Sequence, residues 1–369
     1  MPPATLASSG GVYTEVEDNN NKGRANRILA MNAGEAITGL TTGTSTSSTA
    51  SGTSHADYFR VATAPAPLGI YRHRLTITTT GAGTHSGTIR GLTQSGSVIS
   101  TTSDAEVQAS STSTTPTKFN QWYGFGKSES LYYRVTGSST TTGNYVSTLT
   151  TEPVTPVSLG NFQPGQITIS TFAQGHTTDT DMWVYDGQLN AIPGYGNDDQ
   201  SIVEGGDGNN NTSQLRREYA PGTYYLMLSN WNLSNNQASP TTDDYTSGNV
   251  LDFPNGIANS TTSTAPIMTF AVTDASGVPQ TFSASKDGAY DIYYATFTVG
   301  TPAPTCGSAD FDNDGDAGTD FDIEAFFACL AGQCCPTCFV GGADFDMDGD
   351  SGTDFDIEAF FRVLAGGNC

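Results

Sequence analysis

The sequence predicts a mainly β protein, with two jelly-roll-like β-sandwich domains followed by a small α-helical module that carries two acidic loops. Charged residues make up only 14% of the 369-residue chain, against about 25% in ordinary soluble domains. Short runs of β-branched and aromatic residues alternate with Gly, Ser and Thr clusters, which is typical of sandwiches. The end of the chain contains two copies of one acidic unit, offset by 34 residues.

Composition divides the chain into consecutive segments. A small-residue leader is expected to form an extended arm, and two strand-rich regions follow it, separated by the proline-containing stretch Thr151–Pro156. Two prolines there resist continuation of a central strand, and a short proline-containing linker precedes the acidic repeats. The predicted parts are the arm 1–13, sandwich one 14–150, sandwich two 157–299, the linker 300–305 and the acidic module 306–369.

Strands are expected wherever β-branched and aromatic residues cluster between turn residues. In the first region these runs are 58–62, 71–79, 87–92, 131–136 and 145–149, and in the second they are 166–172, 181–186, 214–219, 223–229, 267–272 and 290–299.

The acidic unit has the residue pattern of a calcium loop. Carboxylates on alternate positions repel one another unless a cation lies among them, and calcium takes six to eight hard oxygen ligands. Gly315 and Gly349 occupy the sixth loop position, where a sharp turn is needed. The rival interpretation, a solvated acidic tail, does not explain the duplication or the placed glycines. The predicted calcium ligands are Asp310, Asp312, Asp314, Asp316, Asp320 and Asp322, with Asp344, Asp346, Asp348, Asp350, Asp354 and Asp356 in the second copy. Asp316 and Asp350 are expected to offer their backbone carbonyl oxygens.

One helix is expected after each loop. Ile323, Phe326, Phe327 and Leu330 have the spacing of a single apolar helix face, and the second copy repeats it. Gly332 and the equivalent Gly366 are expected to end the helices.

A duplicated calcium loop with only a following helix resembles the dockerin family, in particular the cysteine-containing variants at the C-termini of secreted bacterial proteins. Dockerins place the closing carboxylate at position twelve, but this chain has Phe321 and Phe355 there. We therefore expect a loop one residue longer, closed by Asp322 and Asp356. The resemblance implies calcium as the cofactor and a cohesin-like protein as a partner.

All six cysteines lie in the acidic module, which favours disulfides in an oxidising compartment. A zinc site is the rival, but Cys335-Pro-Thr-Cys338 supplies only half of one. Equivalence between the repeats favours Cys306–Cys335 and Cys338–Cys369, which leaves Cys329–Cys334. The start of the chain has no positively charged region followed by an apolar run. Because disulfides require export, we expect a mature secreted form, or a start chosen downstream.

Four segments of the second region follow one another in a recognisable order: Thr168–Phe172, Asp179–Tyr185, Gly196–Asp199 and Ala220–Leu226. In these segments the region resembles bacterial pre-peptidase C-terminal β-sandwich domains, which are accessory domains of secreted proteins. The first region shows the resemblance more weakly. Side chains with hard oxygen atoms within these segments suggest a second metal site. The simpler interpretation is that they form an Asx turn. Its candidate ligands are Asp179, Asp181, Asn197, Asp198 and Asp199.

Catalytic motifs are not found, and we expect no enzyme. The four histidines lie in Thr- and Gly-rich segments and are expected on the surface or in turns: His55, His73, His85 and His176. Trp122, Trp183 and Trp231 are candidates for a sugar-binding platform, although most aromatic residues of a sandwich are core residues.

The expected function is that of a secreted or cell-surface, non-enzymatic bacterial protein, in which a calcium-ordered module mediates assembly, with filaments as one outcome. A monomeric adaptor that docks to a cohesin-like receptor is the alternative, and carbohydrate binding is a third. A net charge of −23 would repel phosphate backbones and argues against nucleic acid as a partner, and no stretch is apolar and long enough for a membrane span.

Overall fold

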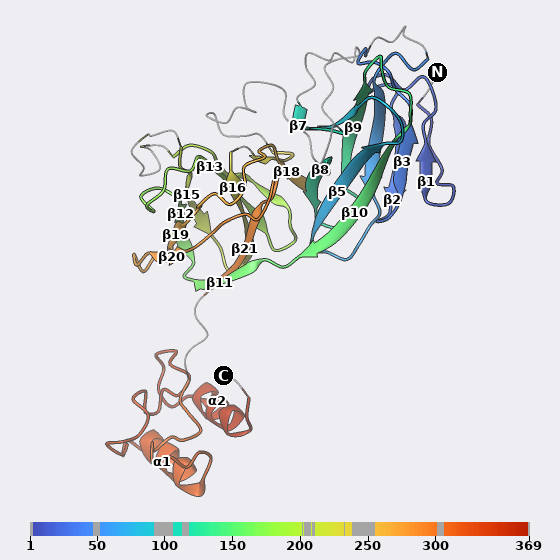
Figure 1. Cartoon of the computed structure of the whole chain (residues 1–369). Coiled ribbons are helices and arrows are strands. Elements are labelled where there is room, and N and C mark those ends of the chain that lie inside the picture. The colour runs from blue at the N-terminus through green and yellow to red at the C-terminus, as the bar shows by residue number, and fades with distance from the viewer. Residues whose placement is uncertain are drawn as a thin grey trace. The chain divides into compact units, whose positions relative to one another are not determined.

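The computed structural model describes residues 3–46, 52–91, 106–112, 118–200, 202, 208, 211–231, 233–237, 255–300 and 306–367. The chain forms two compact units, an N-terminal unit of Met1–Gly160 with Pro164–Val299, and a C-terminal module of Gly300–Cys369 with Asn161–Gln163 (Figure 1). Across the described residues the fold has four sheets and two helices, so the prediction of a mainly β protein is confirmed. Apart from Gly300, the predicted linker lies outside the described residues.

Two sheets make up the first half of the N-terminal unit, in the strand orders β1-β3-β10-β5-β8-β18-β17 and β2-β4-β9-β6-β7. All the strands predicted in the first region are present, and five further strands, β1, β2, β3, β7 and β8, join them. The bounds are β1 (Val12–Thr14), β2 (Asn26–Met31), β3 (Ala36–Gly39), β4 (Asp57–Thr63), β5 (Ile70–Thr79), β6 (His85–Arg90), β7 (Glu106–Ser111), β8 (Lys118–Gly124), β9 (Ser130–Gly137), β10 (Tyr145–Val154), β17 (Leu233–Ser234) and β18 (Gly256–Asn259).

Buried side chains from both sheets form one core in this half. Ile37 and Leu75 come from the seven-stranded sheet, and Phe59 and Tyr133 come from the five-stranded sheet, and all four are fully buried. Because successive residues of a strand point to opposite faces, each strand contributes only alternate residues to such a core. The arrangement is sandwich-like, as the sequence predicted.

The second half of the N-terminal unit has a five-stranded sheet, β11-β21-β16-β13-β14, and a four-stranded sheet, β15-β12-β19-β20. Apolar residues are buried on both sheets, among them Val184, Leu226, Ile169 and Val272. The bounds are β11 (Val157–Phe162), β12 (Gly165–Ser170), β13 (Thr180–Asp186), β14 (Ala191–Asn197), β15 (Gln214–Tyr219), β16 (Gly222–Asn230), β19 (Phe270–Thr273), β20 (Gln280–Phe282) and β21 (Tyr293–Val299).

The two halves share a sheet and a core. Ile257 of β18 pairs with Tyr123 of β8, so a strand from late in the chain extends the first half's sheet. A buried cluster combines Tyr123 with Trp183 and Tyr294 from the second half. The predicted border at 151–156 therefore falls inside one compact unit. Across the described part of the chain, no helix combines the length and apolar character needed to cross a membrane.

Candidate metal centre

The C-terminal module contains the two predicted helices, α1 (Asp320–Leu330) and α2 (Asp354–Leu364). Each begins at a threonine N-cap, Thr319 or Thr353, whose side chain accepts a hydrogen bond from the backbone of the residue three positions on. The aspartate at that third position returns the interaction, which completes a capping box. Gly332 and Gly366 follow the last turns with φ of 79° each, a left-handed conformation that glycine adopts at low cost.

Four phenylalanine rings form the centre of this module. Phe311 and Phe345 of the loops and Phe326 and Phe360 of the helices are fully buried. The Phe326 and Phe360 rings stack with centroids 4.2 Å apart. Phe327, on the predicted apolar helix face, contacts the Phe326 ring, but its own side chain is 45% exposed.

The acidic loops bring three carboxylates together in each copy. One oxygen from each of Asp310, Asp312 and Asp314 lies within 4.8 Å of the others, and the second copy repeats the cluster with Asp344, Asp346 and Asp348. The backbone folds around them, since Gly315 N donates to Asp310 Oδ2 at 3.2 Å and Asp314 N donates to Asp312 Oδ1 at 3.2 Å. The remaining Oδ1 of Asp310 is buried and accepts no hydrogen bond from the described residues.

The loop geometry explains the glycine at the sixth position. Gly315 has a φ of 100° and Gly349 a φ of 98°, a region that L side chains rarely adopt. The turn directs successive carboxylates to one side, and the two loops agree in each of these contacts: Gly349 N donates to Asp344 Oδ2 at the same 3.2 Å.

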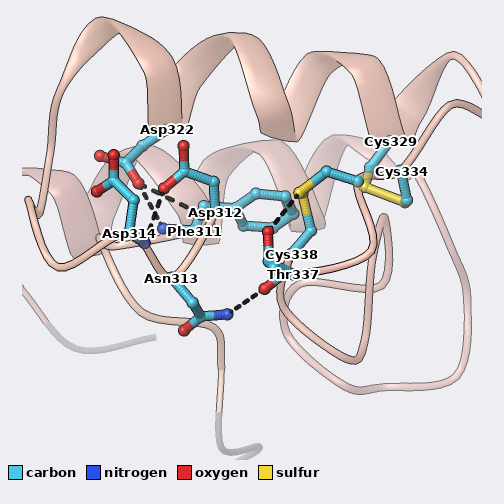
Figure 2. Close-up of a disulfide and its surroundings, with 10 residues drawn as sticks. Phe311, Asp312, Asn313, Asp314, Asp322, Cys329, Cys334, Thr337 and Cys338 are labelled. Atoms are coloured by element: carbon cyan, nitrogen blue, oxygen red, sulfur yellow. Dashed lines mark hydrogen bonds between the residues drawn. A yellow bond between two sulfur atoms is a disulfide. The ribbon is translucent and has the colours of Figure 1, made fainter.

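The predicted closing residues tie each loop to its helix. Asp322 Oδ1 accepts from Phe311 N at 2.6 Å (Figure 2). Asp322 Oδ2 accepts from Thr319 N at 2.8 Å. Asp356 makes the same bonds to Phe345 and Thr353. Although burial raises the pKa of Asp322, these hydrogen bonds outweigh it and lower the pKa, so the carboxylate is charged. Asp322 thus holds Asp312, a member of the carboxylate cluster, and its neighbour Phe311 in place.

The remaining predicted ligands lie outside the clusters. The side chains of Asp316, Asp320, Asp350 and Asp354 are exposed, and Asp320 and Asp354 are the first residues of their helices. A negative charge there stabilises the N-terminal end of a helix.

Desolvation and mutual repulsion both act on the carboxylates of the loops. Local desolvation and the neighbouring charges of Asp314, Asp322 and Asp310 raise the pKa of Asp312. The pKa of Asp346 is raised for the same reasons in the second copy. A divalent cation among these oxygens would remove the repulsion. The donor set is all oxygen, which is the preference of calcium.

The second predicted site is only partly assembled. Oxygens of Asp179, Asp198 and Asp199 lie within 4.8 Å of one another. Asp181 Oδ2 instead accepts from Leu233 N at 2.7 Å, and Asn197 Oδ1 accepts from Gln214 N at 2.7 Å. These two side chains hold backbone segments together.

The module's disulfides differ in part from the prediction. Cys329–Cys334 is confirmed, whereas Cys335 pairs with Cys338. The predicted pairs Cys306–Cys335 and Cys338–Cys369 are therefore wrong. Cys306 is also disulfide-bonded, and Cys369 lies outside the described residues. The Cys335–Cys338 segment contacts the first loop, since Asn313 Nδ2 donates to Thr337 O at 2.7 Å (Figure 2).

The expectations for histidine and tryptophan need correction. His55, His73 and His85 are buried rather than on the surface. Trp122 and Trp183 are also buried, so they cannot form a sugar platform with Trp231. Each of these residues lies in or beside a strand that packs into a core, and sequence spacing alone did not show it.

Comparison with models of known protein families and with curated proteins finds no match.

Proposed function

We propose that this chain is a secreted, non-enzymatic structural or surface protein, whose dockerin-like C-terminal module binds two calcium ions and mediates assembly. The jelly-roll-like N-terminal unit is its scaffold. The observation that carries the proposal is the pair of matching carboxylate clusters, in which Asp310 and Asp344 each keep one buried oxygen without a hydrogen-bond partner among the described residues. A bound cation gives that oxygen a partner.

The module also has an apolar surface suited to protein contact. Phe327 and Phe361 occupy equivalent helix positions, their ring centroids lie 6.3 Å apart, and they are 45% and 44% exposed. Exposed aromatic residues are frequent centres of binding energy at interfaces. Because both follow calcium loops on short helices, ordering of the loops would fix this pair for binding.

The test uses the full-length chain in calcium and then in chelator, followed by sedimentation velocity and electron microscopy. We expect assemblies in calcium that dissociate in chelator and that the double variant Phe327→Asp, Phe361→Asp does not form. The double variant Ile267→Asp, Val278→Asp, which adds the same two charges at exposed apolar residues outside the module, is the control. Monomers under both conditions would refute self-assembly and leave the adaptor that docks to a cohesin-like receptor.

A further inference from the structure

A second cluster of metal-ligand side chains lies in the N-terminal unit, far along the chain from the acidic loops. Glu15 and Glu17 follow β1, and His55 and Asp57 lead into β4. In extended backbone, residues two apart point to the same side. Glu15 and Glu17 thus form one pair of side chains, beside the edge of the seven-stranded sheet. His55 and Asp57 form a second pair, at the five-stranded sheet.

These pairs converge, together with Asp18. One ligand atom from each of Glu17, Asp18 and His55 lies within 4.8 Å of the others, and so does one from each of Glu15, Glu17 and Asp57. Glu17 belongs to both groups and lies at the centre of the cluster. His55 and Asp57 are fully buried, with 0% of each side chain exposed.

Four buried polar atoms in the cluster have no hydrogen-bond partner among the described residues: both carboxylate oxygens of Glu17, Asp57 Oδ1 and His55 Nε2. Asp57 Oδ2 accepts from the Tyr145 hydroxyl at 2.9 Å, but Asp57 Oδ1 accepts from no donor. His55 Nδ1 lies 3.3 Å from the carbonyl oxygen of Ala56, which favours the proton on Nδ1. His55 Nε2 then carries a lone pair, lies 3.4 Å from Glu17 Oε2 and makes no hydrogen bond. This orientation, with the far nitrogen held by a carbonyl, is that of a metal-ligating histidine.

The protein supplies little positive charge to these acids. Among the ion pairs of the described residues, Arg24 reaches Asp18 at 3.2 Å, and no lysine or arginine pairs with Glu15, Glu17 or Asp57. Glu15 is stabilised by Leu40 N at 2.6 Å and the Tyr145 hydroxyl at 3.2 Å. Burying unpaired carboxylates is costly, and such groups are normally paired or bound to metal.

A shared proton is the competing explanation. Burial and the nearby charge of Glu15 raise the pKa of Asp57 well above its usual value. A proton between Asp57 and Glu15 would relieve their repulsion, but it would leave both oxygens of Glu17 and the Nε2 atom of His55 without a hydrogen bond. A cation would interact with all of these atoms.

We propose that Glu17, Asp18, His55 and Asp57, with Glu15 beside them, bind one divalent cation of the Zn²⁺ or Mn²⁺ type. A mixed imidazole and carboxylate donor set suits these ions better than calcium, which prefers oxygen alone. The ion would join the segment after β1 to the start of β4 and so fasten the two sheets of the first sandwich at one end. This site does not depend on the calcium loops.

The test uses the full-length chain with Asp310→Asn and Asp344→Asn, so that the loops contribute little metal. The protein is dialysed against ZnCl₂, MnCl₂ or CaCl₂ and its metal content is measured. We expect one Zn²⁺ or Mn²⁺ per chain, a higher melting temperature with the ion, and at least tenfold weaker binding in Glu17→Gln. Glu218→Gln, an exposed acid on β15, should bind as the parent does.

Because His55 is buried and its variants risk misfolding, the position of the ion is checked on the unmodified chain by anomalous diffraction at the zinc edge. A peak beside His55 Nε2 would support the proposal. A folded chain that retains no ion, the absence of a peak beside His55 Nε2, or unchanged binding in Glu17→Gln would overturn it and favour the shared proton.

Discussion

The sharpest prediction concerns Asp310→Asn in the first acidic loop. Asparagine has the same shape and keeps an oxygen that can accept from Gly315 N, which donates to Asp310 at 3.2 Å. The change therefore removes one negative charge with little effect on the loop's backbone. Asp344→Asn makes the same change in the second loop, so the prediction can be tested twice in the same molecule.

The magnitude follows from the charge removed. A calcium ion lies about 2.4 Å from a ligand oxygen, and these loops are open to water, since Asp314 and Asp348 are exposed. With a dielectric constant of about 80, a divalent ion and a unit charge at that distance attract by about 3 kcal/mol. The amide oxygen retains part of this, so we expect roughly ten- to hundredfold weaker binding, at about 1.4 kcal/mol per tenfold.

Titration calorimetry of the full-length chain with calcium measures this. The unmodified chain should bind two ions at similar affinity, and each single variant should retain one such site. Glu324→Gln, an exposed acid on α1 outside the cluster, controls for the loss of one charge. Equal affinity in Asp310→Asn and the unmodified chain, or an equal loss in Glu324→Gln, would refute the assignment of the clustered oxygens as ligands.

Three further predictions concern stability and covalent structure. Phe326→Ala should destabilise the module by about 3 to 5 kcal/mol in chemical unfolding, because the ring is fully buried, whereas exposed Phe321→Ala should change it by less than about 0.5 kcal/mol. Burial lowers the pKa of His73 to about 4, below the value of about 6.5 in an unfolded chain. As the pH falls from about 6.5 towards 4, the unfolded chain takes up a proton that the native chain does not, so the free energy of unfolding should fall by about 2 to 3 kcal/mol. His73→Gln should lack that part of the slope, and an identical slope would contradict it. Peptide mapping without reduction should recover the two disulfides described here, and a Cys306–Cys335 peptide would contradict them.

The acidic loops and the helices that follow them were predictable because their signals are local. A glycine at position six, alternate carboxylates and a following apolar period all lie within nineteen residues. Thr319 and Asp322 form the capping box three residues apart, a spacing that sequence alone can show. The predicted strands were found for the same reason, since β-branched runs are local patterns.

Features that depend on contacts between distant segments were missed. β18 was not predicted because it lies in a polar stretch of the sequence. It belongs to the first half's sheet only through its pairing with β8. Repeat equivalence suggested Cys306–Cys335, but Cys338 lies only three residues from Cys335, and the chain turns there to contact the first loop. His55 received no role because its neighbours in space, Glu17 and Asp18, are about forty residues away in the chain.

In our proposal the C-terminal module needs its metal for a reason visible in its size. Helices of eleven residues are too short to be stable alone in water, and its fully buried aromatic core consists of Phe311, Phe326, Phe345 and Phe360. Small domains with so little core are usually stabilised by disulfides or metals, and this one has both kinds of group. Without a cation, three carboxylates within 4.8 Å in each loop oppose the folding that the phenylalanines favour. With calcium bound, the carboxylates no longer oppose folding. Asp322 and Asp356 then connect each ordered loop to its helix, because they accept hydrogen bonds from Phe311 and Phe345, which lie beside the cluster residues. Calcium concentration would therefore control whether Phe327 and Phe361 are held in a geometry suited to a partner.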